Sequence, residues 1–144
     1  MLPQLESVVK GKKIPEGLPL VEAMFIAELQ NMLLTAGHDL DQISLPLRFS
    51  VSTGQESYLT LSGREVTAVA GDLMFSDRQS VISSILRGPD RRTAITEGTS
   101  RVLYSAYAPP GVEQELTMKH LNDMEGYVRL FSKEAVTTVK KIYG

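Results

Sequence analysis

The sequence predicts an α+β fold, in which helices flank a layered sandwich of mixed or antiparallel sheet. Two observations carry this prediction. The spacing of apolar residues changes from a helical period to a strand period after about residue 40, and it returns to a helical period after Pro109-Pro110-Gly111. A run of strands flanked by helices, without strict alternation of the two, is typical of α+β domains.

The first predicted element is a helix that begins near Pro19 and ends at Gly37. Proline suits the first helical turn, and glycine adopts the left-handed conformation that stops a helix. Apolar residues lie on most sides of this helix, so we expect only four polar positions to be solvated. These are Glu22, Glu28, Gln30 and Asn31.

Short strands are predicted to follow the helix. Alternating, branched or aromatic residues mark them, and turn residues such as Ser62-Gly63 and Ala70-Gly71-Asp72 separate them. The predicted strands cover residues 45–51, 58–61, 66–69, 73–75, 81–86 and 102–107.

A second amphipathic helix is predicted over residues 112–131, with His120 on its solvated face. We therefore expect an N-terminal leader over 1–17, one domain over 18–132 and a C-terminal tail over 133–144. The tail could form a short helix or an edge strand, since propensity favours neither.

The composition of the chain excludes several kinds of functional site. The chain has 144 residues, a net charge of -2 and no cysteine, which excludes a thiolate nucleophile, a disulfide scaffold and a cysteine zinc site. No apolar run is long enough to span a membrane, and the N-terminus lacks the order of a secretory signal. We expect a cytoplasmic protein without membrane contact, and nothing indicates a cofactor or a metal.

Two enzyme classes lack their motifs. The glycines form no phosphate-cradling loop between a strand and a helix, which argues against a P-loop nucleotide hydrolase. None of the serines lies in a G-x-S-x-G or S-x-x-K pattern that would activate a hydroxyl.

An imidazole meets two carboxylates where His38 is followed by Asp39 and Asp41. A catalytic zinc would need a further protein ligand that this segment does not supply. The favoured alternative is that both aspartates close the loop after the helix. Asp72 and Asp77, which flank a short apolar strand, are expected to serve turns in the same way.

Positive charge is densest before and after Thr93, at Arg87, Arg91, Arg92 and Arg101. Guanidinium groups on such a loop could contact RNA phosphates. Charge alone favours the alternative that these are solvated arginines paired with Asp90 and Glu97.

Four segments together resemble the B3/4 domain of the phenylalanyl-tRNA synthetase beta chain and its free-standing relatives. They are LPLVEAMFIAELQNMLLTAGHDLDQI (18–43), YLTLSG from Tyr58, GDLMFSD from Gly71 and DRRTAITEGTSRVLYSAYAPPGV from Asp90. Their order and spacing match over residues 18–112, with the last helix also in place. The resemblance implies a B3/4-like α+β sandwich. Within the synthetase, that domain hydrolyses the ester of tyrosine mistakenly attached to phenylalanine tRNA.

The resemblance also implies roles for particular residues. The chain would bind tRNA or an aminoacyl-tRNA end, and trans-hydrolysis of a mischarged ester is left open. His38 and Asp90 would hold water or the substrate amine. The ligand-pocket candidates are His38, Asp39, Asp41 and Asp90, and the phosphate-binding candidates are Arg87, Arg91 and Arg92.

Departures from the family pattern keep a rival open. Ala36 stands where the synthetase has a histidine, Phe25 replaces a family asparagine, and residues 83–89 lack an Arg- and Trp-rich strand. The rival is a non-catalytic binding or regulatory module for a small amino-acid-like ligand or a protein partner. Every functional hypothesis needs the turn after the first helix and the loop before Thr93 to meet at one cavity.

Overall fold

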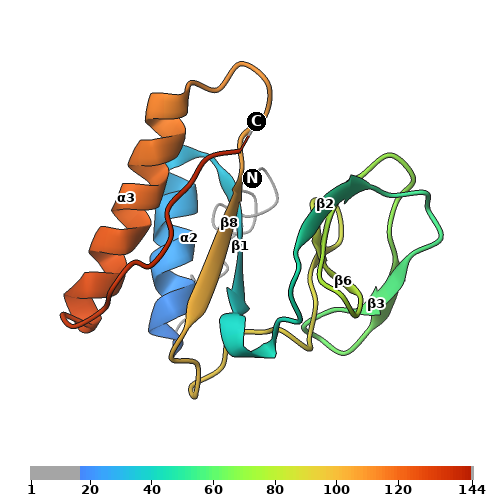
Figure 1. Cartoon of the computed structure of the whole chain (residues 1–144), viewed down its shortest axis with the longest axis horizontal. Coiled ribbons are helices and arrows are strands. Elements are labelled where there is room, and N and C mark those ends of the chain that lie inside the picture. The colour runs from blue at the N-terminus through green and yellow to red at the C-terminus, as the bar shows by residue number, and fades with distance from the viewer. Residues whose placement is uncertain (1–16, 144) are drawn as a thin grey trace, which may run out of the picture. The chain divides into compact units, whose positions relative to one another are not determined.

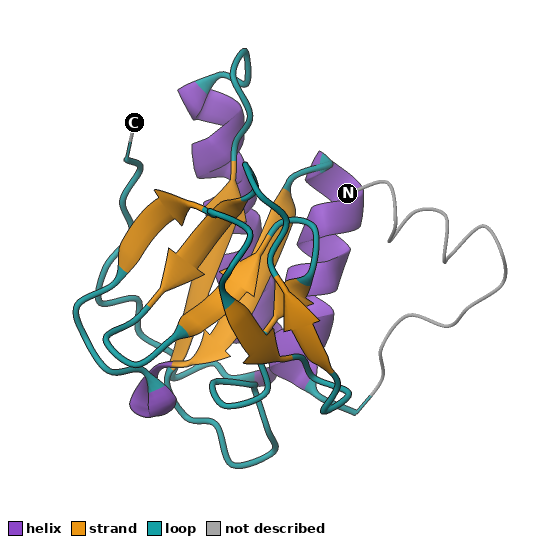
Figure 2. Ribbon diagram, turned by 90° about the vertical axis from the view of Figure 1, so that its right-hand side faces the viewer, coloured by secondary structure: helices purple, strands orange, loops and turns teal. Residues whose placement is uncertain are grey.

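The computed structural model describes residues 17–143. Within this range lie two α-helices, α2 (Pro19–Asn31) and α3 (Gln114–Phe131), and a 3-10 helix, η1 (Leu40–Gln42). The strands are β1 (Leu34–Asp39), β2 (Arg48–Val51), β3 (Ser57–Leu59), β4 (Glu65–Thr67), β5 (Leu73–Ser76), β6 (Val81–Ser84), β7 (Gly88–Pro89) and β8 (Val102–Tyr107). The predicted α+β class is confirmed, since one long helix precedes the strands along the chain and the other follows them. Figure 2 shows the helices and strands in separate colours.

The chain forms two compact units. The described residues up to Thr35 and those from Tyr104 onward form the first, and Ala36–Leu103 form the second. The prediction of one domain over residues 18–132 stays a prediction. Most of the predicted leader, residues 1–16, lies outside the described residues.

In the first unit α2 packs along α3 (Figure 1), with Ala27 and Met124 fully or almost fully buried. Pro19 occupies the first turn of α2 as expected. The predicted end at Gly37 is wrong, because Met32 already adopts a left-handed φ of 58° and its N–H bonds to the Glu28 carbonyl. The residues after it form β1. A buried helix and a buried strand are both apolar without interruption, so periodicity could not separate them.

Three positions expected to be solvated are buried. Glu28 is 1% exposed and accepts a hydrogen bond from the Thr35 N–H at 2.7 Å. Asn31 is 8% exposed, and its Nδ2 lies 3.2 Å from Nδ1 of His120, which is itself fully buried. The His120 Nε2 lies 2.6 Å from the Thr35 hydroxyl. The two helices therefore share a buried polar seam, which a purely hydrophobic pattern does not indicate.

The second unit contains an antiparallel sheet of order β2-β5-β6-β7 and the antiparallel β3–β4 hairpin. Its core consists of Tyr58, Ala68, Met74 and Val81, with Val66 packed against them. The predicted strand 45–51 begins only at Arg48, and the predicted strand 81–86 ends at Ser84. Strands β1 and β8 pair as a separate two-stranded sheet, and β8 has the predicted bounds.

The described part of the tail forms neither a helix nor a strand. It is fastened to α3 by an ion pair of 2.6 Å between Lys140 and Glu125. The Arg129 Nε also donates to the carbonyl of Ala135 at 3.3 Å. Over residues 17–143, neither long helix has the continuous apolar length that a bilayer crossing requires.

Candidate functional site

An open cavity of about 490 Å³ lies in the second unit. Strand β3 (Ser57–Leu59) lines it together with Ser80 and residues 90–92. Backbone hydrogen bonds place the loop there: the Asp90 N–H donates to the Ile82 carbonyl at 2.8 Å, and the Arg91 N–H donates to the Leu59 carbonyl at 2.8 Å. The segment after β7 is thus held between β6 and β3.

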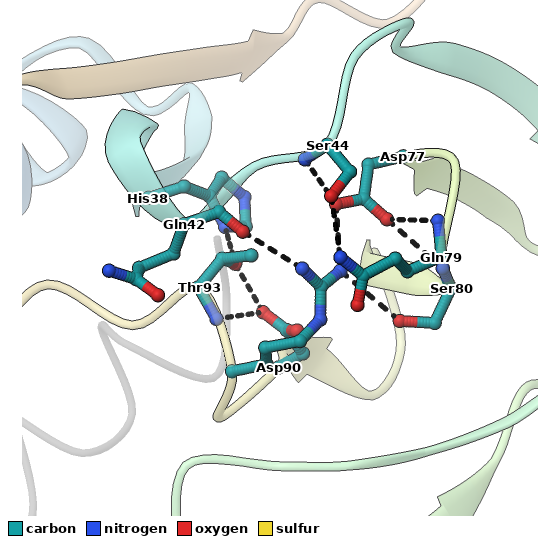
Figure 3. Close-up of polar contacts among 9 residues, drawn as sticks. His38, Gln42, Ser44, Asp77, Gln79, Ser80, Asp90 and Thr93 are labelled. Atoms are coloured by element: carbon teal, nitrogen blue, oxygen red, sulfur yellow. Dashed lines mark hydrogen bonds and ion pairs between the residues drawn. The ribbon is translucent and has the colours of Figure 1, made fainter.

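Asp90 brings a buried carboxylate to this cavity. The residue is 3% exposed, and its Oδ1 accepts the Thr93 N–H at 3.3 Å and the Thr93 hydroxyl in a short hydrogen bond (Figure 3). Burial raises the pKa of Asp90, and the hydrogen bonds from Thr93 oppose that rise without cancelling it. A buried carboxylate of this kind can accept hydrogen bonds from an ammonium group.

His38 reaches the same network from the opposite side. Its Nδ1 lies 2.8 Å from the Thr93 hydroxyl, and the side chain is fully buried, outside the cavity lining (Figure 3). Burial lowers the pKa of His38 to about 4, against a smaller rise caused by Asp77. His38 is therefore a neutral imidazole at pH 7, and it cannot touch a ligand in the cavity without a rearrangement.

Arg92 serves the structure of the site. Its guanidinium pairs with Asp77 at 2.8 Å and donates to the Gln42 carbonyl at 2.8 Å and to the Ser80 hydroxyl at 3.3 Å. Asp77 also accepts the N–H groups of Ser44 and Ser80. Burial raises the pKa of Asp77, but these hydrogen bonds outweigh it and lower the value to about 2. The loop arginines were expected to pair with Asp90 and Glu97, but the guanidinium of Arg92 pairs with Asp77 instead.

Three other arginines surround the β3–β4 hairpin. The Arg87 Nε donates to the Thr67 carbonyl at 3.1 Å. Arg91 lies so close to Gly63 that a Cβ there would be 2.7 Å from its Nη1. Arg64 belongs to the hairpin turn, where its carbonyl accepts the N–H of Thr60 at 3.0 Å. None of these three guanidiniums forms an ion pair with a residue that the structure describes.

We define Arg64, Arg87 and Arg91 as the hairpin arginines. Arg64 is not predicted from the local density of charge, because it lies far from the other two along the chain. The available signal was the Ser62-Gly63 turn, which returns the chain beside β3 and brings Arg64 with it.

Asp39 and Asp41 do not line the cavity. The Asp39 carboxylate caps η1 by accepting the Asp41 N–H at 3.0 Å, and it also accepts the Thr99 hydroxyl at 2.9 Å. Asp41 pairs with Arg101 at 2.7 Å. The turn interpretation of Asp39 is confirmed. Arg101 finds its partner in Asp41 rather than in Glu97.

Asp72 and Asp77 also serve turns as expected. Asp72 accepts the N–H groups of Leu73 and Leu86, and Asp77 accepts those of Gln79 and Ser80. Within residues 17–143, no three His, Asp or Glu side chains are grouped closely enough to hold a metal ion.

The structure brings together part of the predicted constellation. The turn after α2 does meet the arginine loop, since the Asp39 N–H donates to the Thr93 carbonyl at 2.8 Å. Of the predicted site residues, Asp90, Arg91 and Arg92 line the cavity, and His38 stands behind them. Asp39, Asp41 and Arg87 are outside the lining.

Helices outside a run of antiparallel strands, with a cavity between a hairpin and a sheet, define an α+β domain. A solved structure with a similar fold is an N-terminal fragment of the phenylalanyl-tRNA synthetase beta-subunit from Pyrococcus horikoshii, with a TM-score of 0.64 and 16% sequence identity. The similarity covers 80% of this chain and 41% of that fragment. No protein-family model matches the chain, and no curated protein sequence matches it. The comparison therefore establishes a shared fold.

Proposed function

We propose that this chain is a B3/4-like domain that binds tRNA, with phosphates on the hairpin arginines and the aminoacyl end in the cavity beside Asp90. The observation that carries the proposal is the position of Arg91. Arg91 lines the cavity, and its guanidinium forms no ion pair with an acidic side chain among the described residues. The fold similarity supports the choice of tRNA as the nucleic acid.

The choice of basic residue also favours nucleic acid. The segment from Ala36 to Leu103 contains seven arginines and no lysine. Guanidinium is planar, matches phosphate oxygens in a fork and stacks on flat rings, so it suits RNA better than an ammonium does. Because Arg64 belongs to the hairpin and Arg87 and Arg91 contact it, we expect the three to bind phosphates of one strand.

An aminoacyl-tRNA terminus carries an ammonium group and phosphates. Among the described residues, the cavity lining contains one acidic residue, Asp90, and Arg91, which forms no ion pair there. A free α-ammonium would bind the Asp90 carboxylate, and the terminal phosphates would bind Arg91. Arg92 is not assigned to phosphate, because three of its five donors already bind Asp77, Ser80 and Gln42 and its charge is paired with Asp77.

A second candidate function is ligand binding without ester hydrolysis. Fully buried His38 is outside the cavity lining, so the imidazole that was expected to hold water or the substrate amine does not face the cavity. This observation favours a module that binds a small amino-acid-like ligand without hydrolysing an ester. Hydrolysis would then require a water held by the cavity itself and polar groups placed for the developing oxyanion.

A salt titration of tRNA binding tests the proposal. Three phosphate contacts predict that log K falls with log salt concentration with a slope of roughly -2 to -3. Removing one contact with Arg64→Ala, Arg87→Ala or Arg91→Ala should make the slope shallower by about 1. Arg78→Ala is the matched control, since Arg78 is exposed but outside the hairpin and cavity. Undetectable tRNA binding by the wild-type protein at low salt would reject the proposal.

Deacylation assays separate the two candidate functions. The protein is incubated with a panel of mischarged tRNAs, including Tyr-tRNA specific for phenylalanine, and loss of the ester is followed. Hydrolysis that disappears in Asp90→Asn supports the editing function. A rate equal to that without protein for every tRNA, together with retained tRNA binding, supports a binding module.

A further inference from the structure

A chain of three buried side chains leads from strand β1 to the cavity. His38 Nδ1 lies 2.8 Å from the Thr93 Oγ1, and Thr93 Oγ1 makes a short hydrogen bond to Asp90 Oδ1 (Figure 3). His38 and Thr93 are fully buried, and Asp90 is 3% exposed. Of these three residues, only Asp90 lines the cavity.

The hydrogen bond at Nδ1 fixes the tautomer of the His38 ring. Among the described residues His38 Nε2 has no hydrogen-bond partner, although it is buried. The ring packs edge-on against Phe75, with 6.3 Å between the ring centroids. Nδ1 faces the Thr93 hydroxyl, whose hydrogen is donated to the Asp90 carboxylate, so the hydroxyl oxygen is left to accept from the ring. The proton of the neutral ring therefore belongs on Nδ1, and Nδ1 donates to Thr93.

The hydrogen bond from the Thr93 hydroxyl to Asp90 has the direction that this tautomer requires. Because Thr93 Oγ1 accepts from His38, its own hydrogen is left to donate to Asp90 Oδ1. The Thr93 N–H donates to the same oxygen at 3.3 Å. With the opposite tautomer, the hydroxyl would have to turn toward His38, and Asp90 would lose one of its two Thr93 donors.

We propose that His38 is a positioning residue, which acts through Thr93 to hold the Asp90 carboxylate in the orientation that receives a ligand's ammonium group. The proposal rests on the proposed function only in the choice of ligand. It changes the role first expected for His38, from direct contact with water or substrate to control of the group that makes that contact. A purely structural role would tie β1 to the loop without setting the properties of Asp90.

Nuclear magnetic resonance of the full-length protein tests the hydrogen bonds from His38 to Asp90 without any ligand. The ¹⁵N shifts of His38 at pH 7 should show a neutral ring protonated at Nδ1. The ¹³C shift of the Asp90 carboxyl should report a pKa that increases in Thr93→Val and in His38→Leu, since each removes support for the donated hydrogen bond. Thr93→Ser and His38→Asn are the matched controls, because each keeps the required donor.

Binding of puromycin, an aminoacyl-adenosine analogue with an amide in place of the ester, tests the ligand step. Its affinity should fall by about fivefold in Thr93→Val and His38→Leu, the usual effect of one lost hydrogen bond, and be retained in the two controls. An Nε2-protonated ring, or an unchanged Asp90 pKa in both deletion variants, would overturn the positioning role. If the resonance results hold and wild-type protein ignores puromycin, the ligand assignment is wrong and the positioning of Asp90 stands. The tautomer is measured on wild-type protein, so the test does not depend on the variants folding.

Discussion

At the scale of single residues, polar side chains in the interior carry most of the information that the sequence pattern does not. Glu28, Asn31 and His120 were expected in solvent because they are polar, yet each is buried with a hydrogen-bond partner on another segment. Their partners lie seven to 89 positions away along the chain. Residue type predicts exposure only when no partner exists, and a single sequence does not contain the pairing.

Glu28 gives the first prediction. Burial raises the pKa of Glu28 to about 7, so the folded state holds a proton that the unfolded chain releases near pH 4.5. Glu28 therefore costs stability as the pH rises from 4.5 through 7, by roughly 3 kcal/mol in total. Glu28→Gln keeps an acceptor for the Thr35 N–H and removes the charge.

Urea unfolding should find Glu28→Gln more stable than wild type at pH 8 and about equal to it at pH 4. Glu22→Gln, a partly exposed change on the same helix, is the control and should show no such dependence on pH. Equal stability of Glu28→Gln and wild type at pH 8 would mean that Glu28 is solvated in solution.

At the scale of elements, local backbone chemistry decides boundaries that hydrophobic period cannot. The last helix was predicted within a few residues of its bounds because its apolar residues recur along one side. The first helix was predicted six residues too long, since Leu33 and Leu34 continue its apolar pattern into β1. What ends it is Met32, a residue type that carries no signal for a left-handed conformation.

Met32 yields the second prediction. Its φ of 58° is strained for a side chain with a Cβ, and the side chain is 49% exposed, so little packing depends on it. Met32→Gly should raise the free energy of unfolding by about 1 kcal/mol. Met32→Ala removes the same side chain but keeps the Cβ, so it should give no gain. A destabilised glycine variant in thermal or urea unfolding would show that the Met32 side chain packs in a way that outweighs the strain.

The loop between β2 and β3 gives the third prediction. The Glu56 carboxylate accepts three consecutive backbone N–H groups, from Thr53, Gly54 and Gln55, as well as the Ser52 and Thr53 hydroxyls. These bonds, led by that of the Ser52 hydroxyl, lower its pKa to about 2. The support it gives the loop is present above pH 4.5 and is lost as the pH falls toward 2.

Amide hydrogen exchange at Thr53, Gly54 and Gln55 should accelerate in Glu56→Ala. Glu65→Ala removes an exposed carboxylate from the neighbouring hairpin and should leave those three amides unchanged. Unchanged protection in Glu56→Ala would assign the loop's order to its backbone alone.

At the scale of the whole molecule, the sequence predicts the class of fold and part of the site. The change of period around residue 40 and the second helix were enough for α+β, because they depend on local spacing. The division into two compact units was not predicted, since it depends on which distant segments touch. At the site, the loop containing Asp90 and Arg91 was found from its charge, whereas Arg64 joins it only through the hairpin.

The last prediction concerns the pH dependence of the whole chain. His38 and Glu28 lie in different units and have opposite effects. Burial lowers the folded-state pKa of His38 to about 4. The free energy of unfolding therefore carries the full contribution of neutral His38 above pH 6.5, and it decreases by roughly 3 kcal/mol as the pH falls from 6.5 through 4. Glu28 gains a similar amount over nearly the same fall in pH. These two groups together should leave the free energy of unfolding almost level between pH 4.5 and 6.5.

Single variants separate the effects of His38 and Glu28 on the free energy of unfolding. In Glu28→Gln only the His38 effect remains, so stability should rise with pH from 4 to 6.5. In His38→Asn only the Glu28 effect remains, so stability should fall as the pH rises from 4.5 to 7, whatever the cost of the substitution itself. The double variant lacks both groups and is the reference from which each single-variant slope is taken, because His120, whose pKa burial also lowers, titrates in all four proteins. Urea unfolding of the four proteins across this range measures all four slopes. Parallel slopes in the two single variants would contradict the assignment, because the two groups must then titrate with the same sign or not at all.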